Sequence, residues 1–327
     1  HPDLVYHWGV KAKAFATAGA VDASLLTHPW LIGHLHPDYP LFLPSLYALT
    51  ARLGGGFAEG PILLWTVALV AATCAAAPAA LRAADAPDAL ARWAPALIAL
   101  AFVPFGIGYL TAGGADWPLT LALVLALPGL LSDDGDDARA EDARVGYAAA
   151  LAAACKIEGM ALAGLLVAGR LARRVARDRL RAPKRTAASA LRVAGPMLLV
   201  VALWWQIGDR LALASSARVG AFTPARLGDA LTGMVGALGA VNWHGLTYLL
   251  LLVPLLAAVR GLRAAALVVL GQLMFYAVVY ATVPGDIARY VDTSAARLYL
   301  HVMPAALLLV LIAGDRVTRG RGIHSGP

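Results

Sequence analysis

Acidic, basic and histidine side chains interrupt an otherwise apolar sequence at a few separated places. The candidate residues are Asp3, Lys11, Lys13, His36, Asp38, Tyr39, Asp116, Lys156, Glu158, Arg297 and His301. Each lies in the first polar segment or at the outer end of an apolar run. Carboxylates beside cationic groups can deprotonate an acceptor hydroxyl while the cations hold a departing lipid phosphate. These residue types therefore suit acid–base chemistry on a phosphate-bearing substrate.

Structural roles compete with chemical ones at these positions. Asp116 precedes a Trp-Pro pair, so a role as a helix N-cap is open to it. Lys156 and Glu158 could form a structural ion pair, and Arg297 could extend its charge to the membrane interface. A lysine at membrane depth costs roughly 2.5–3.5 kcal/mol on insertion scales. Lys156 is therefore the hardest of these residues to explain by structure alone.

The first polar segment holds weaker candidates. Lys11 and Lys13 suit substrate binding or anchoring at a membrane interface. The histidines His28, His34 and His36 could ligate a metal, but their spacing in a loop is a weak pattern. We therefore assign no metal residues and no certain cofactor, although a divalent cation is compatible with the site.

Composition indicates an integral membrane protein. Of 327 residues, 60% are hydrophobic and 14% are charged, whereas a soluble chain carries roughly 25% charged residues. The net charge of +7 does not indicate nucleic-acid binding, because the basic residues lie in short runs between apolar segments. Cys74 and Cys155 each lie inside an apolar stretch without paired spacing, so we expect neither a disulfide nor a zinc site.

The elements that position these residues are predicted to be helices. We expect an all-α polytopic membrane protein with about nine spans or half-spans and a juxtamembrane helix over 40–53. The apolar runs are 60–81, 94–111, 117–131, 145–155, 159–171, 193–208, 245–259, 264–283 and 298–313. No signal-like or spanning segment precedes the polar stretch 1–40, so we expect a first membrane helix to be missing upstream.

Basic residues predict the orientation. The loop 170–192 holds nine Lys and Arg, and such loops stay in the cytoplasm. Counting crossings from it divides the chain into an extracytoplasmic loop with the juxtamembrane helix (1–57), a transmembrane domain with an outer catalytic cavity (58–313) and a cytoplasmic tail (314–327). The acidic loop 132–144 falls inside and is expected to be solvated. If 40–53 spans instead, everything before residue 156 inverts.

Two apolar runs are unusually short. The runs 145–155 and 159–171 correspond to about 16–20 Å of helix each and meet at the turn that contains Lys156 and Glu158. Charged residues between two half-depth helices predict a water-filled cavity in the outer leaflet, because irregular backbone at that depth must line protein or water.

Together, these motifs resemble the GT-C superfamily of membrane glycosyltransferases, which use polyprenyl-phosphate sugars. The nearest likeness is the bacterial branch related to protein mannosyltransferases and the lipid A aminoarabinose transferase. The likeness extends from residue 1 to about residue 313. The motifs that carry it are Asp3-x-x-x-x-Trp8-x-x-Lys11-Ala12-Lys13, His36-x-Asp38-Tyr39-Pro40-Leu41, Ala115-Asp116-Trp117-Pro118-Leu119, Lys156-Ile157-Glu158-Gly159 and Arg297-Leu298-Tyr299-Leu300-His301-x-x-Pro304.

The resemblance implies a role for each residue. Asp3 and Asp116 match the family's catalytic acids, although Leu4 follows Asp3 where related enzymes often carry an acidic pair. The donor phosphate would be held by Lys156, Arg297 and His301. The residues Lys11, Lys13, His36, Asp38, Tyr39 and Glu158 would bind substrate.

The implied reaction is an inverting transfer from a polyprenyl-phosphate-linked sugar to a lipid, glycan or protein hydroxyl. It would take place on the outer face of a bacterial inner membrane. A transporter or lipid flippase is the main alternative, because charge between broken helices is also a transporter feature. A non-catalytic membrane scaffold is a further alternative, but it would not explain why Lys156 and Asp116 lie at membrane depth. The enzyme hypothesis requires Asp3, Asp116, Lys156 and Arg297 to converge on one outer cavity.

Overall fold

The computed structural model describes residues 7–31, 35–102, 114–132, 138–178, 183–214, 220–239 and 245–320, and within these ranges every regular element is a helix. This confirms the predicted all-α class. The elements are α1 (Gly9–Ala18), α2 (Ala23–Leu26), α4 (Phe42–Leu53), α5 (Glu59–Ala83), α6 (Asp88–Phe102), α8 (Asp116–Leu131), α9 (Ala138–Cys155), α10 (Ile157–Asp178), α11 (Pro183–Arg210), α12 (Pro224–Ala237), η4 (Leu246–Leu252), α13 (Val253–Leu256), α14 (Arg263–Thr282), α15 (Ile287–Leu300) and α16 (Met303–Thr318).

Three described helices, α5, α11 and α14, are long and apolar enough to cross a membrane. The bent pair α15 and α16 adds a fourth if the pair forms one span. The chain is thus a helical protein with candidate membrane spans. The larger number of crossings expected from the apolar runs stays a prediction.

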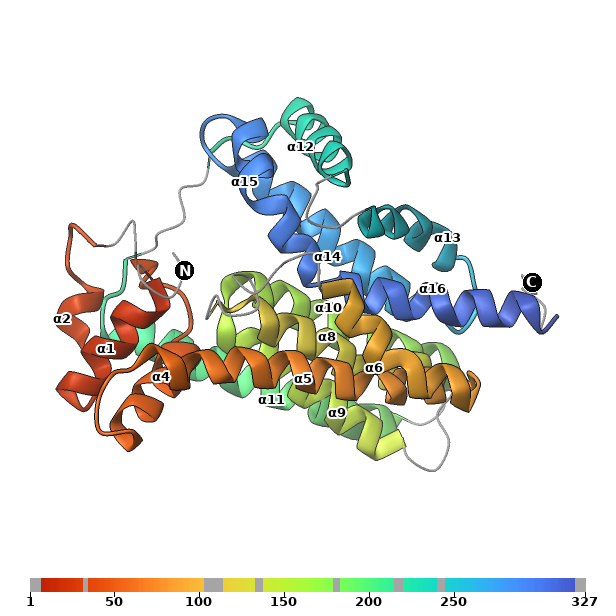
Figure 1. Cartoon of the computed structure of the whole chain (residues 1–327), viewed down its shortest axis with the longest axis horizontal. Coiled ribbons are helices and arrows are strands. Elements are labelled where there is room, and N and C mark those ends of the chain that lie inside the picture. Colours follow the sequence, from red (N-terminus) through yellow and green to blue (C-terminus); the bar gives the residue numbers. More distant parts are fainter. Residues whose placement is uncertain are drawn as a thin grey trace.

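Helix α8 forms the centre of the bundle (Figure 1). Apart from Asp116 and Thr120 its sixteen residues are apolar on all sides, and all but one of the sixteen are buried. A helix that is hydrophobic all round must be covered all round. Its neighbours include α5, α9, α10, α14, α15 and α16, so α8 can contact residues from distant parts of the sequence.

The N-terminal helices form a small unit at one end of the bundle, at the left of Figure 1. Helix α4 packs against α1, and Trp65 Nε1 of α5 donates to Thr50 Oγ1 of α4 at 2.9 Å. The twelve residues of α4 extend only about 18 Å, whereas the hydrocarbon core is about 30 Å thick. This length agrees with a juxtamembrane helix over 40–53, and its placement at the membrane surface stays a prediction.

The predicted half-depth helices are in fact full-length. Helices α9 and α10 contain 18 and 22 residues, or about 27 and 33 Å, and only Lys156 separates them. The apolar runs 145–155 and 159–171 are the parts of these helices next to Lys156. Away from Lys156, each helix continues into charged sequence that was expected to form loops.

Paired charges allow this continuation. Asp142 of α9 is fully buried, and its carboxylate lies 2.9 Å from Arg170 Nε and 3.2 Å from Arg174 Nη2, both on α10. Arg170 also donates to the carbonyl of Gly129 at 2.7 Å. The expectation that 132–144 is solvated is therefore wrong at Asp142. A buried carboxylate needs charged partners, and here it joins α9 to α10.

Two other apolar runs are not single helices. The run 245–259 contains the 3₁₀ helix η4 followed by the short α13. The run 298–313 is interrupted by a 55° bend between α15 and α16. Pro304 has no N–H to donate to the carbonyl of Leu300, and Thr120 Oγ1 of α8 donates to that carbonyl instead at 3.1 Å. The bend is thus fixed against α8.

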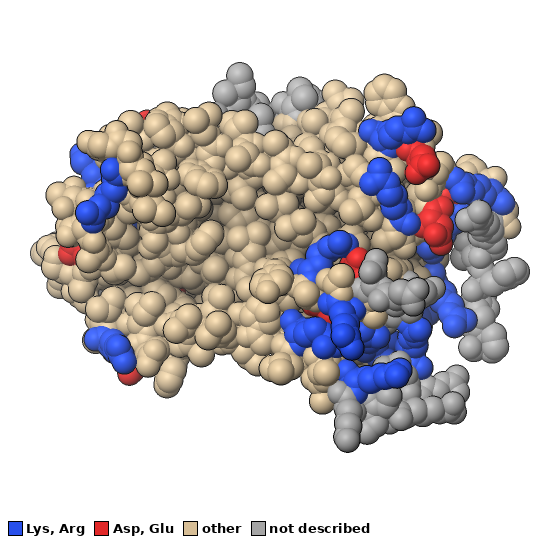
Figure 2. All heavy atoms as spheres, turned by 90° about the horizontal axis from the view of Figure 1, so that it is seen from below, with Lys and Arg blue, Asp and Glu red and all other residues tan. Residues whose placement is uncertain are grey.

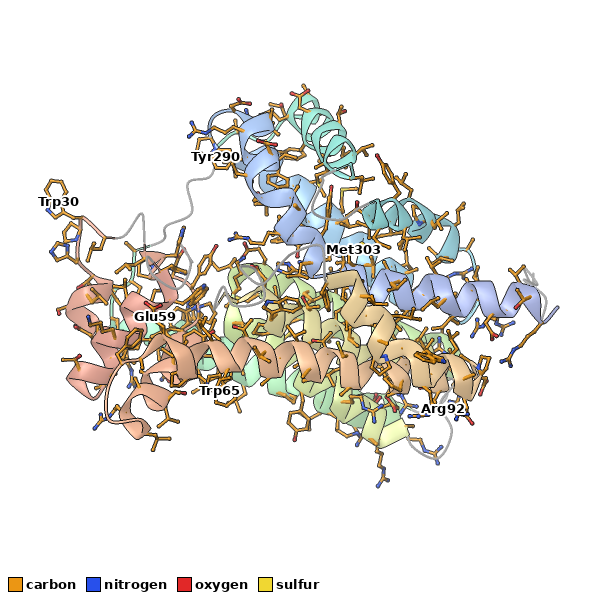
Figure 3. The ribbon with its side chains drawn as sticks, in the orientation of Figure 1. Trp30, Glu59, Trp65, Arg92, Tyr290 and Met303 are labelled. Carbon is orange, nitrogen blue, oxygen red and sulfur yellow. The ribbon has the colours of Figure 1, made fainter. Side chains whose placement is uncertain are left out.

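Charged side chains gather towards the two ends of the molecule, and Figure 2 shows a broad surface without them in between. Glu59, at the start of α5, and Arg92, on α6, lie towards opposite ends (Figure 3). The end that includes the α5–α6 turn, the start of α9 and the end of α16 is rich in Lys and Arg (Figures 1 and 2). We call it the basic end. The assignment of this end to the cytoplasm stays a prediction.

Replacing Gly146 by Ala should destabilise the bundle. A Cβ at this position of α9 would lie 2.3 Å from the carbonyl oxygen of Arg192 on α11, so the two backbones would have to separate. Overpacking of this kind costs about 1–3 kcal/mol. Thermal unfolding in detergent should show a lower midpoint for Gly146→Ala.

The matched control is Gly164→Ala on α10, where an added Cβ meets nothing within 4 Å. That change should be neutral or stabilise by up to about 1 kcal/mol through helix propensity. Equal midpoints for the two variants would contradict the close approach of α9 and α11.

Candidate functional site

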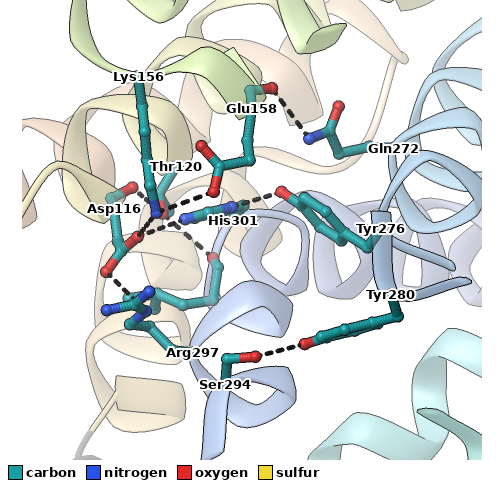
Figure 4. Close-up of polar contacts among 11 residues, drawn as sticks. Asp116, Thr120, Lys156, Glu158, Gln272, Tyr276, Tyr280, Ser294, Arg297 and His301 are labelled. Atoms are coloured by element: carbon teal, nitrogen blue, oxygen red, sulfur yellow. Dashed lines mark hydrogen bonds and ion pairs between the residues drawn. The ribbon is translucent and has the colours of Figure 1, made fainter. Parts of the chain in front are cut away.

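The carboxylate of Asp116 lies at the centre of a buried charged cluster (Figure 4). Its Oδ1 accepts a hydrogen bond from Lys156 Nζ at 3.2 Å and lies 2.9 Å from His301 Nε2. Its Oδ2 lies 3.6 Å from Arg297 Nε. The carboxylate of Asp116 on α8 thus contacts a side chain from the α9–α10 junction, one from α15 and one from the α15–α16 bend.

The N-cap explanation is contradicted for Asp116. The N-cap of α8 is Ala115, which makes no side-chain cap bond, and Asp116 belongs to the first helical turn. Arg297 pairs with Asp116, and its extension to a membrane interface stays a prediction. Its side chain is 29% exposed, so it forms an accessible edge of the cluster.

Lys156 is positioned by a tight break between two helices. Its carbonyl accepts from the backbone N–H of Gly159 and Met160, which begins α10 immediately after α9 ends. A Cβ at Gly159 would lie 2.0 Å from the carbonyl oxygen of Ala152, so only glycine allows the helix ends to approach this closely. The ammonium group is held beside α8 by this geometry.

His301 is held from both sides. Its Nε2 faces Asp116, and its Nδ1 is hydrogen-bonded to the hydroxyl of Tyr276 on α14. The hydroxyl of Thr120 on α8 lies within hydrogen-bond distance of the carbonyl of the preceding residue, Leu300, and of the carbonyl of Asp116. Tyr276 and Thr120 therefore act as positioning residues for the cluster.

Glu158 completes the cluster on the opposite side of Lys156. Its Oε1 lies 3.5 Å from Lys156 Nζ, so the ion pair between these two residues that was considered from the sequence is present. The ammonium group of Lys156 also contacts Asp116. The second oxygen, Oε2, is buried and has no hydrogen-bond partner among the described residues. Gln272 of α14 donates to the backbone carbonyl of Glu158 at 3.3 Å. Glu158 therefore keeps one acceptor atom for a ligand.

The first polar segment contributes an aromatic and basic layer. Lys11 is fully buried, donates to the carbonyl of His36 at 3.1 Å and lies 5.1 Å from the centre of the Trp8 ring. The rings of His36 and Tyr39 stack at 4.9 Å. Burial lowers the pKa of Lys11 to about 7, and the negative charge of Asp38 opposes this shift only in part.

His7 links this layer to the charged cluster. Its ring packs edge-on against Trp8 at 4.1 Å and His36 at 5.2 Å. Burial, together with the positive charges of residues that include Lys11 and Lys156, lowers the pKa of His7 to about 2. Neither ring nitrogen has a hydrogen-bond partner in the described parts of the chain. His7 is therefore a neutral group with capacity to accept a hydrogen bond.

The structure brings together most of the predicted site residues. Asp116, Lys156, Glu158, Arg297 and His301 form the cluster (Figure 4). The residues of the adjacent layer are Lys11, His36, Asp38 and Tyr39.

Lys13 does not belong to the site, because it is exposed while Lys11, two positions earlier on α1, is buried. Asp3 lies outside the described residues, as does His34. His28 is exposed. Among the described residues, no group of three His, Cys, Asp or Glu side chains could hold a metal ion.

Lys156 and His301 are buried against the carboxylate of Asp116, so these charged and polar groups are paired directly. The water-filled cavity expected in the outer leaflet stays a prediction. Access to the cluster is by way of Arg297 and Glu158, which are partly exposed.

Sequence reasoning missed His7, Thr120 and Tyr276. A histidine before a tryptophan and a tyrosine within an apolar run carry no spacing signal. Only the convergence of three distant segments shows their role. The Asp116–Thr120 spacing of four residues could have indicated a shared helix face.

No protein-family model matches the sequence, and no curated protein or solved structure matches it significantly. The resemblance to membrane glycosyltransferases therefore stays a hypothesis that depends on the motifs and the geometry of this site.

Replacing Lys11 by Met should flatten the pH dependence of stability. Because the pKa of Lys11 falls from 10.5 in the unfolded chain to about 7 in the fold, the unfolded chain binds more protons between these values. Stability therefore rises with pH from 7 to 10.5, by on the order of a few kcal/mol. The thermal midpoint at pH 7, 8 and 9 checks this.

The exposed Lys13 on the same helix supplies the control. Lys13→Met should keep the wild-type slope, whereas Lys11→Met should lose most of it. An unchanged slope in Lys11→Met would show that the buried environment does not lower the pKa of Lys11.

Proposed function

We propose that the protein is a membrane glycosyltransferase. It transfers a sugar from a polyprenyl phosphate to an acceptor hydroxyl, with inversion at the anomeric carbon. The observation that carries this proposal is the pairing of Lys156 and Arg297 on one buried carboxylate, Asp116, beside the end of α9 that is remote from the basic end.

The two cations suit the leaving phosphate. As the bond between the anomeric carbon and the phosphate oxygen breaks, negative charge develops on the phosphate, and preorganised cations stabilise it. Arg297 is partly exposed and can present its guanidinium to a lipid-borne phosphate as a bidentate partner. Lys156 and Arg297 would thus exchange part of their contact with Asp116 for contact with the donor.

Asp116 is better suited to position these cations than to act as the base. A carboxylate that faces an ammonium, a guanidinium and an imidazole is stabilised in its ionised form and is a weak proton acceptor. This revises the catalytic role expected from sequence. Asp116 would instead fix the spacing of Lys156 and Arg297.

The acceptor hydroxyl needs a base on the other side of the sugar. The family likeness assigns this role to Asp3, and among the described residues Glu158 has an unpartnered carboxylate oxygen. His7 has a pKa of about 2, so it can accept a hydrogen bond from a hydroxyl but cannot hold its proton. We therefore assign the orientation of the acceptor, and not its deprotonation, to His7.

Replacing Lys156 by Met should reduce sugar transfer by about 10²-fold or more, because one donor to the developing phosphate charge is lost. The assay uses membranes that contain the protein, a panel of polyprenyl-phosphate sugars and extraction of labelled products. Lys13→Met is the control and should keep full activity, since its side chain is exposed and away from the cluster. Undiminished transfer by a folded Lys156→Met variant would remove the phosphate role.

Replacing Asp116 by Asn should not weaken the binding of polyprenyl phosphate, whereas replacing Lys156 by Met should weaken it. Loss of the carboxylate frees Lys156 and Arg297 from a competing anion, so polyprenyl phosphate should bind at least as tightly as to the wild type. Turnover should still fall, since the cations lose their fixed spacing. Binding of labelled polyprenyl phosphate to protein in detergent checks this, and weaker binding by Asp116→Asn than by Lys156→Met would contradict the assigned roles.

A flippase would use the same buried charges to move a lipid phosphate. The two functions separate in proteoliposomes with a fluorescent polyprenyl-phosphate sugar. Release of the sugar to an acceptor supports the enzyme, whereas movement of intact donor between leaflets without release supports the flippase.

A further inference from the structure

An apolar groove of about 500 Å³ runs between α10 and α14. On α10 it is lined by Leu165 and by the exposed alanines Ala168 and Ala172, and on α14 by Ala264 and Leu267. Leu267 is 52% exposed, so the groove is open to the surroundings of the molecule. Because α14 is a candidate membrane span, these surroundings are expected to be lipid.

The groove has a basic mouth. Arg260 and Arg263, which lie just before and at the start of α14, are both lining residues and both exposed. Arg173 of α10 lines the same end and donates to the carbonyls of Leu131 and Ser132. None of the lining residues is acidic, so the groove combines apolar walls with positive charge at one end.

We propose that this groove binds one acyl chain of an anionic phospholipid, with the lipid phosphate on Arg260 and Arg263. Basic pockets between membrane helices attract anionic headgroups. The lining of α10 from Leu165 to Ala176 extends about 16 Å, close to half of the hydrocarbon core, as an acyl chain from one leaflet requires. Charge complementarity favours a phosphate-bearing lipid over a second apolar helix.

This site is separate from the Asp116 cluster. The cluster lies where α10 begins, whereas the groove follows the later part of α10 towards its other end. Its occupant would therefore be a structural lipid on the basic side and not the sugar donor. The inference does not depend on the proposed glycosyl transfer.

The test compares lipids by native mass spectrometry of the purified protein. Phosphatidylglycerol should bind at least tenfold more tightly than phosphatidylcholine of the same chain length. Arg260→Gln with Arg263→Gln should remove this preference. Ala172→Trp, at an exposed alanine, should fill the groove and weaken binding of both lipids.

Arg92→Gln is the matched control, because Arg92 is an exposed arginine of the basic end on α6, which does not line the groove. It should bind phosphatidylglycerol as the wild type does. Equal lipid binding by the double variant and the wild type would overturn the proposal. Displacement of phosphatidylglycerol by glycerol phosphate alone would also overturn it, because it would indicate a site for soluble anions. A groove that is closed by dimerisation of the chain would overturn it as well.

Discussion

A buried carboxylate must be neutralised, and the structure around the junction of α9 and α10 depends on how this is done for Asp116. Water cannot reach its oxygen atoms freely, so Lys156, Arg297 and His301 supply the charge and hydrogen bonds. Removing one partner from such a cluster costs more than the contact itself contributes, because the remaining charge stays buried. The helices that carry these residues must therefore meet at one point, and their ends are shaped by that requirement.

Two of the helical segments that reach the cluster are interrupted there, one between α9 and α10 and one between α15 and α16. Gly159 permits the sharp junction that presents Lys156, and Pro304 permits the bend that presents His301. In each case a backbone feature that would weaken an ordinary helix places a charged or polar side chain. The freed carbonyl of Leu300 is not left unsatisfied, since Thr120 donates to it. The breaks are thus part of the site and not defects in the spans.

The same requirement applies at the basic end, where Asp142 is a second buried carboxylate. There, the arginines of α10 are the excess charge, and Asp142 is the carboxylate that neutralises part of it. This pairing lets α9 and α10 continue as helices through polar sequence. Between the two ends lies a wide surface without charge, which Figure 2 shows directly. An apolar belt between two charged ends is the arrangement that a bilayer requires.

Composition and the apolar runs predicted the helical class, the membrane character and the approximate positions of several helices, because these depend on local hydrophobicity. The motif residues Asp116, Lys156 and Arg297 were also recognised, since charges inside apolar sequence are unusual. Tertiary structure alone decided which charges pair. From the sequence, a Lys156–Glu158 pair and a convergence of Lys156 with Asp116 were both open, and in the fold Lys156 contacts Glu158 and also Asp116, forty positions away. The pairing of charges depends on which helix ends meet in space, and neither the hydropathy nor the spacing of residues in the sequence specifies which ends meet.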